Sequence, residues 1–101
     1  MSLASPLKKD VEKAQKDLDL LQRFYNIYFQ GGEEEPPNRE RKLLNELIEK
    51  IKQQVATCTN AGDRFQANGL ISKFKTMTGK WDITLRNIET GKIKRPKKRR
   101  T

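Results

Sequence analysis

Hydrophobic residues recur along the first third of the chain at alternating steps of four and three positions. This spacing keeps them on one face of an α-helix, because a helix advances 3.6 residues per turn. Ser5 and Pro6 form a favourable start, since a serine hydroxyl caps free amides and proline fits the first helical position. The pattern predicts a helix over about residues 6–30. Its apolar stripe is formed by Leu7, Val11, Ala14, Leu18, Leu21, Tyr25 and Tyr28.

The same spacing returns twice after an interruption by Gly31, Gly32, Pro36 and Pro37. Glycine permits a left-handed helix cap and proline prevents helix continuation, so this segment is predicted to be a loop. A second helix is predicted over about residues 39–60; its stripe is Leu44, Ile48, Ile51, Val55 and Cys58, widened by Leu43 and Leu47. A third helix is predicted over about residues 63–89; its stripe is Leu70, Phe74, Met77, Trp81, Leu85 and Ile88, flanked by Phe65 and Ile71.

The second and third helices are expected to be antiparallel, because the turn between them is short. We expect Gly62 to close the second helix, Asp63 to cap the third, and Gly79 to bend or interrupt the third. Acid–base pairs four residues apart mark exposed faces. These pairs are Glu12–Lys16, Asp19–Arg23, Glu46–Lys50 and Asp82–Arg86. Residues 1–91 are therefore predicted to form an all-α, antiparallel three-helix bundle that is elongated and coiled-coil-like.

The composition agrees with a thin apolar seam between long helices. Of the 101 residues, 34% are hydrophobic and 35% are charged, which is too polar for a deep globular core. No apolar run is long enough to span a membrane, and the first residues do not resemble a secretory signal. Cys58 has no second cysteine with which to pair. We therefore expect a cytoplasmic protein without a membrane partner.

Positive charge is concentrated at the C-terminal end. Residues 1–91 contain 15 Lys and Arg against 13 Asp and Glu, whereas residues 92–101 contain no acid. The seven cations there are Lys92, Lys94, Arg95, Lys97, Lys98, Arg99 and Arg100. Such a segment buries too little apolar surface to offset its ordering entropy, so we predict a disordered basic tail. Its cations are candidate contacts for nucleic-acid phosphates; the alternative is a tail that only solubilises the chain.

Side chains that usually carry catalysis are few. The sequence contains no histidine, and so lacks the ordinary general base near neutral pH and the imidazole metal ligand. Cys58 alone cannot form a zinc site and is expected to be a buried core residue. Glu33, Glu34 and Glu35 lack the spacing of a calcium loop, so we expect them to be solvated or to fold back on the basic tail. The sequence predicts no enzymatic activity, no cofactor, no metal and no small-molecule substrate.

Aromatic residues gather near the end of the first predicted helix, at the pole where the third helix also ends. Adjacent faces of one helix cannot all point at two partner helices, so some of these side chains are expected to be exposed and to contact protein. The candidate contact residues are Phe24, Tyr25, Tyr28, Phe29 and Trp81. For Trp81 a role as a core anchor is favoured, and Arg64 is expected to pack its stem and bond a neighbouring group.

Several aromatic, glycine, proline and arginine positions stand in a distinctive order. They are FYNIYFQGGEEEPP at 24–37, NAGDRF at 60–65, and then Leu70, Phe74, Trp81, Leu85, Ile88, Glu89 and Gly91. This order resembles a family of small helical domains from myxobacteria and other deltaproteobacteria, often C-terminal in longer proteins. That family has no assigned activity, so the resemblance implies a bacterial cytoplasmic domain and supplies no catalytic residue. The basic tail lies outside it.

Together these features predict a non-catalytic protein–protein interaction or scaffolding module that binds a protein partner or a second copy of itself. The alternative is a nucleic-acid-binding protein whose basic tail contacts phosphates. A dedicated nucleic-acid binder usually also spreads cations over one folded face, whereas residues 1–91 carry a net charge of only +2.

Overall fold

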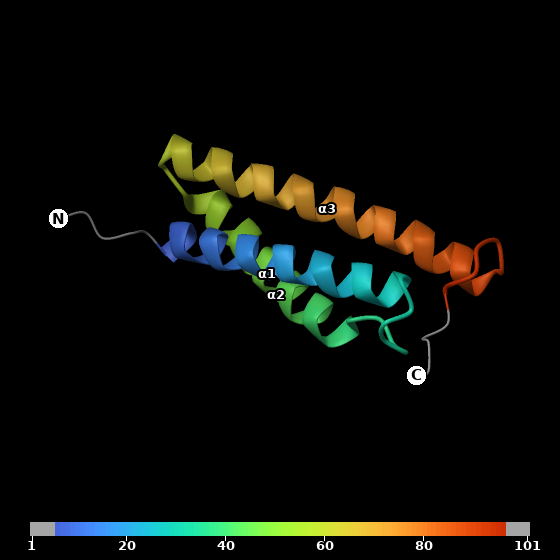
Figure 1. Ribbon diagram of the computed structural model, residues 1–101. Coiled ribbons are helices and arrows are strands. Elements are labelled where there is room, and N and C mark those ends of the chain that lie inside the picture. Colours follow the sequence, from blue (N-terminus) through green and yellow to red (C-terminus); the bar gives the residue numbers. More distant parts are fainter. Residues whose placement is uncertain (1–5, 97–101) are drawn as a thin grey trace.

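The computed structural model describes residues 6–96, and these form three long helices and no strand. Helix α1 spans Pro6–Phe29, α2 spans Asn38–Thr57 and α3 spans Ala61–Glu89 (Figure 1). Consecutive helices run in opposite directions, and each helix contacts the other two. The predicted all-α, antiparallel three-helix bundle is therefore confirmed. Ser5 and the four tail cations from Lys97 to Arg100 lie outside the described residues.

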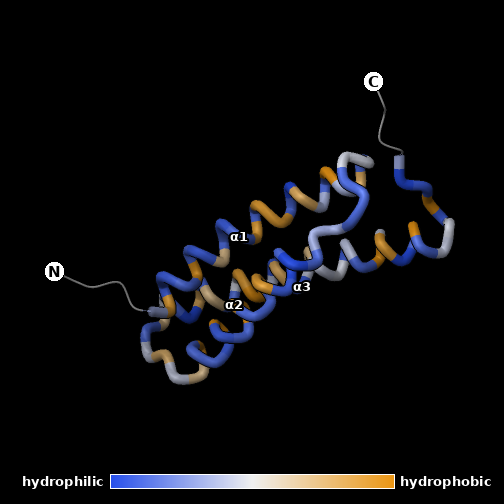
Figure 2. Tube along the Cα trace, turned by 90° about the horizontal axis from the view of Figure 1, so that it is seen from below, coloured by the Kyte–Doolittle hydropathy of each residue, from blue (hydrophilic) through white to orange (hydrophobic). Residues whose placement is uncertain are grey.

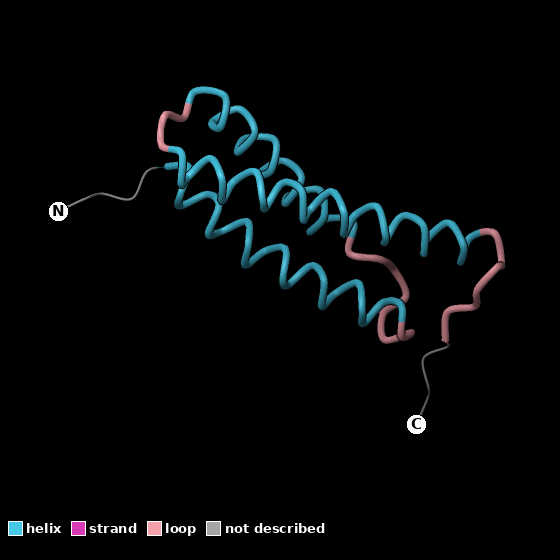
Figure 3. The backbone as a smooth tube through the Cα atoms, turned by 90° about the horizontal axis from the view of Figure 1, so that it is seen from above, coloured by secondary structure: helices cyan, strands magenta, loops and turns pink. Residues whose placement is uncertain are grey.

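The bundle is elongated, with extents of 55 × 27 × 17 Å. The turn between α2 and α3 is short, while residues 30–37 make a longer connection from α1 to α2 (Figure 3). Helix α3 extends past the adjoining ends of α1 and α2, so the chain that follows it starts beyond the rest of the bundle. We call the end where α1 stops, α2 starts and α3 stops the aromatic pole. None of the three helices has an apolar stretch sufficient to cross a membrane.

The core is the seam that the apolar spacing predicts. Hydrophobic positions recur along each helix between hydrophilic ones (Figure 2). The buried side chains are Leu7, Ala14, Leu18, Leu21, Tyr25, Tyr28, Leu44, Ile48, Ile51, Ala67, Leu70, Phe74 and Trp81. Val11, Val55 and Met77 are half-buried and pack against this seam. Burial of the seam stabilises the fold by about 25 cal/mol per Å² of apolar surface.

Helix α1 ends in a glycine cap. Gly31 is left-handed, with φ of 84°, and its N–H donates to the Tyr28 carbonyl at 3.0 Å. The Gly32 N–H donates to the Ile27 carbonyl at 2.8 Å. This pair of bonds is the Schellman motif, which satisfies carbonyls that a helix end leaves free. A Cβ on Gly32 would approach the Ile27 side chain to 2.7 Å, so a side chain at position 32 would clash.

The turn between α2 and α3 differs from the predicted one. Helix α2 ends at Thr57, because the backbone of Cys58 is extended. Asn60 caps α3, and its side-chain oxygen accepts from the Asp63 N–H at 3.0 Å. The predictions that Gly62 closes α2 and that Asp63 is the cap were therefore wrong. Asn60 is the N-cap because its short side chain places an amide oxygen within reach of the free N–H three residues ahead.

Helix α3 is continuous through Gly69 and Gly79, so the predicted interruption near Gly79 was wrong. Phe65, expected to flank the apolar stripe of α3, is 80% exposed. Asp19, Lys50 and Asp82, each expected to pair within its own helix, form ion pairs across helices instead. These ion pairs are Asp10–Lys50 at 3.3 Å, Asp19–Lys73 at 4.0 Å and Asp82–Arg41 at 2.7 Å.

Candidate docking surface

Three of the five candidate contact aromatics belong to the core. Tyr25 is fully buried and stacks on Trp81, with ring centroids 4.3 Å apart and ring planes 20° apart. Tyr28 is also buried, and Phe29 lies beside both tyrosines at centroid distances of 5.6 Å. Aromatic pairs of this kind add about 0.5–1.5 kcal/mol beyond their area burial. Phe24 is exposed and Phe29 half-buried. The prediction that Tyr25, Tyr28 and Trp81 contact a protein partner is not supported by their burial.

Arg41 on α2 links the buried aromatic cluster to α3. Its Nη1 donates to the Tyr25 hydroxyl at 3.2 Å, and its two terminal nitrogens donate to the two carboxylate oxygens of Asp82 at 2.7 and 3.0 Å. The hydrogen bond from Arg41 lowers the pKa of Asp82, and partial burial opposes that shift. The same bond raises the pKa of Arg41 above its already high value. Both groups therefore stay charged at neutral pH, and the link holds the three helices in register.

An apolar surface lies on the side of α1 and α2 that faces away from α3. Leu20, Phe24 and Ile27 follow one face of α1, and Leu43 lies opposite them on α2. These four side chains are 38–56% exposed. They are contiguous, because the same hollows are lined by Phe24 from α1 and by α2 residues. We call this surface the α1–α2 face.

Two open hollows shape the α1–α2 face. One of about 390 Å³ lies between the helices and is lined by Leu20, Phe24, Leu43 and Leu47, among others. The other, of about 600 Å³, lies under the α1–α2 loop and includes Phe24 and Ile27. Its rim carries three acids and one cation, namely Glu33, Glu35, Glu40 and Arg39. The hollow between the helices is mainly apolar, whereas the one under the loop is about half polar. An apolar hollow beside a polar rim is typical of a protein contact.

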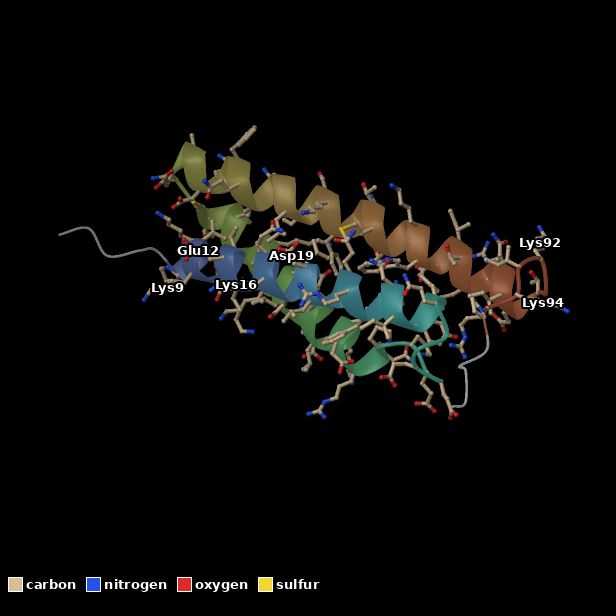
Figure 4. The ribbon with its side chains drawn as sticks, in the orientation of Figure 1. Lys9, Glu12, Lys16, Asp19, Lys92 and Lys94 are labelled. Atoms are coloured by element: carbon tan, nitrogen blue, oxygen red, sulfur yellow. The ribbon has the colours of Figure 1, made fainter. Side chains whose placement is uncertain are left out.

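The first part of the basic tail is attached to the aromatic pole. Arg95 lies over the Tyr28 ring, 4.4 Å from its centroid, and donates to the carbonyls of Tyr28 and Glu33. The tail thus folds back on the acidic loop through the Glu33 backbone carbonyl, but among residues 6–96 no ion pair joins a loop carboxylate to a tail cation. Lys92 and Lys94 are exposed and project away from the bundle (Figure 4). Lys97, Lys98, Arg99 and Arg100 lie outside the described residues.

No metal centre forms within residues 6–96, where no three Cys, Asp or Glu side chains gather closely enough to hold an ion. Glu33, Glu34 and Glu35 are exposed. Cys58 is half-buried rather than buried, because α2 ends before it, and its thiol donates weakly to the Asn60 carbonyl at 3.6 Å. Arg64 is exposed at the start of α3. These residues do not converge on a common site.

Leu20, Ile27 and Leu43 belong to the α1–α2 face but were not among the predicted contact residues. Leu43 was assigned to the inner stripe of α2, and Leu20 was not singled out. A signal was present, because Leu20, Phe24 and Ile27 are spaced by four and three residues and so form a second row beside the core stripe of α1. Comparisons with family models, curated proteins and solved structures found no match. The resemblance to small deltaproteobacterial helical domains stays a prediction.

Proposed function

We propose that this protein is a non-catalytic protein–protein interaction or scaffolding module and that the α1–α2 face is its docking surface. The observation that carries the proposal is the contiguous exposure of Leu20, Phe24, Ile27 and Leu43. Leaving large apolar side chains in water is unfavourable, and a partner that covers them recovers about 25 cal/mol per Å² before the costs of association. Exposed apolar patches of this kind mark interaction surfaces.

The rest of the molecule supports a binding role. The sequence contains no histidine. The charged groups with shifted pKa values, Arg41 and Asp82, bond each other and tie helices together rather than facing a hollow. We place the module in the cytoplasm as part of the proposal, because Cys58 is a free thiol and reducing compartments keep thiols unpaired.

Site-specific cross-linking tests the docking surface. A photoreactive amino acid replaces Leu43 in one variant and Ile83 in a matched control, since Ile83 is 61% exposed on α3 and lines neither hollow of the α1–α2 face. We expect a discrete cross-linked species from position 43 alone. The captured protein, purified and titrated against the module, should bind L43E at least about tenfold more weakly than I83E. Equal capture from both positions, or equal affinity of both variants, would reject the proposal.

A second candidate function is nucleic-acid binding through the basic tail. The observation that favours it is the acid-free run of seven cations after Gly91, together with the outward projection of Lys92 and Lys94 (Figure 4). Cations on an arm of this kind bind phosphate with little sequence preference. Comparing duplex binding by the full chain and by a chain truncated after Gly91 tests this function, because truncation removes all seven cations.

A further inference from the structure

The α1–α2 face carries both a ridge and a groove. Leu20, Phe24 and Ile27 form a ridge along α1, and the 390 Å³ hollow between this ridge and Leu43 and Leu47 of α2 forms a groove beside it. Helices pack when the side-chain ridges of one surface enter the grooves of another. A surface that contains both features can pack against a copy of itself, as an interface with two-fold symmetry requires.

The two ends of the face differ in charge. At the aromatic pole, three acids, Glu33, Glu35 and Glu40, line the larger hollow with one cation, Arg39. At the other end, the side chains of Lys13 and Lys50 are 66% and 61% exposed. Their acidic partners are more covered: the side chain of Asp17 is 34% exposed and that of Asp10 is 18% exposed. The lysines are therefore the more exposed members of the two ion pairs at that end. Two copies packed in parallel would set acid against acid, whereas an antiparallel pair sets acid against lysine.

The spacing along α1 matches an antiparallel pair. We place the two-fold axis halfway between Leu20 and Phe24, one to two residues before the midpoint of the ridge from Leu20 to Ile27. Lys13 lies nine residues before that point, or roughly 13 Å at 1.5 Å per residue. Helix α1 ends at Phe29, seven residues or roughly 10 Å beyond it, and the acidic loop follows. The axis therefore brings Lys13 of each copy opposite Glu33 and Glu35 of the other.

We propose that a second copy of this chain occupies the α1–α2 face, in an antiparallel dimer centred on Leu20 and Phe24. The inference rests on the proposed function, because it names the partner for the same surface. Two helices about 10 Å wide over a shared length of roughly 25 Å cover about 500 Å² of each copy. Stable interfaces cover about 800 Å² per partner, so the dimer should be weak, with dissociation in the micromolar range.

Sedimentation velocity of the full chain, from low micromolar to millimolar concentration, tests the dimer. We expect a reversible rise from monomer to dimer mass. L43E should weaken it at least about tenfold, because a charge enters the apolar centre, while I83E on α3 should leave it unchanged. Circular dichroism on both variants verifies the helical fold. A chain that stays monomeric throughout overturns the dimer alone, since a different partner captured at position 43 would still support the docking surface. A dimer that L43E leaves intact also overturns it.

Charge reversal tests the antiparallel orientation. K13E alone, and E33K/E35K alone, should each weaken self-association roughly tenfold at low salt, because each places like charges in both symmetry-related contacts. Mixing the two variants should restore association as a heterodimer, since both contacts then pair opposite charges. High salt should reduce these differences. If the mixture associates no better than either variant alone, the antiparallel arrangement is rejected.

Discussion

Arg41 bonds to residues of both other helices, and each of its contacts has a different energetic weight. The Asp82 carboxylate is about half exposed, so its ion pair with Arg41 is screened by water and contributes less than about 1 kcal/mol. The Tyr25 hydroxyl belongs to a fully buried residue and receives a hydrogen bond from Arg41. A buried polar group that loses its partner costs about 1–3 kcal/mol. The Tyr25 contact should therefore matter more for stability than the ion pair.

Stability should depend on pH through Asp82. Its pKa is lowered in the folded state by the hydrogen bond from Arg41, so its contribution is present above the ordinary carboxyl value of 3.8 and is lost as pH falls below it. At pH 7 we expect D82N to have a free energy of unfolding lower than that of the original chain by less than about 1 kcal/mol. At acidic pH the two chains should have the same stability. Urea unfolding of both chains from pH 7 to below pH 3.8 measures this difference in the free energy of unfolding. A difference of constant size at all pH values would contradict the assignment.

R41A is the companion change at the same contact. It removes the donor to Tyr25 as well as the partner of Asp82, so it should cost about 2 kcal/mol and exceed the effect of D82N. Urea unfolding at pH 7 compares the two variants directly. If R41A and D82N lower the free energy of unfolding equally, the hydrogen bond from Arg41 to the Tyr25 hydroxyl does not stabilise the fold.

Within the helices, glycines at a helix end and glycines inside a helix affect stability differently. Gly31 has φ of 84° and forms the cap of α1, where an L side chain is strained. Gly69 and Gly79 lie inside α3, and a Cβ added at either would meet no atom within 4 Å beyond the adjoining helix backbone. Alanine has a helix propensity about 1 kcal/mol better than glycine. Replacing glycine with alanine should therefore stabilise the fold at positions 69 and 79 and destabilise it at position 31.

We predict that G69A and G79A each raise the free energy of unfolding by about 0.5–1 kcal/mol, while G31A lowers it by about 1 kcal/mol or more. Thermal unfolding followed by circular dichroism measures all three variants. G31A is the matched contrast, because it adds the same methyl group where the backbone conformation is unfavourable. Destabilisation by G79A would indicate that α3 is not continuous there in solution.

The sequence predicted the helices well because their stripes are long and regular, and the buried residues of α1 are all on its predicted stripe. It predicted the exposed surface poorly. A helix in a three-helix bundle has two partners, and the apolar rows of α1 and α2 are wider than two partners can cover. Which flank stays open depends on the side of the α1–α2 pair against which α3 packs. Periodicity within single helices does not contain that information, so Leu43 was placed in the core.

The spacing of charged residues within one helix also gave wrong predictions, because it contains no information about the neighbouring helices. Asp82 has Arg86 four residues away, yet it forms its ion pair with Arg41 on another helix. A planar guanidinium can hold both oxygens of one carboxylate, and the bundle brings Arg41 to the right distance. The turn after α2 was also missed, since Asn60 and Asp63 are both good caps and only the backbone path at Cys58 decides between them.

For the whole molecule, the contacts of Arg95 join the basic tail to the bundle. Its guanidinium covers the Tyr28 ring and donates to a carbonyl at the C-terminal end of α1, where the helix carries partial negative charge. The tail is thus anchored at its third cation. Within residues 92–96, Arg95 therefore contacts the pole, whereas Lys92 and Lys94 are exposed.

R95A and a chain truncated after Gly91 should separate the role of Arg95 from that of the other tail cations. Both should lose about 1 kcal/mol of stability, because both remove the contacts with Tyr28 and Glu33. If the tail binds nucleic acid, R95A keeps six of its seven cations and should still bind a random duplex, with the salt slope reduced by about one at most. The truncated chain should lose that binding. Duplex titrations at several salt concentrations measure both effects, and a truncated chain that binds as well as the full chain would reject the nucleic-acid function. Unchanged stability of R95A would instead show that the tail is not anchored in solution.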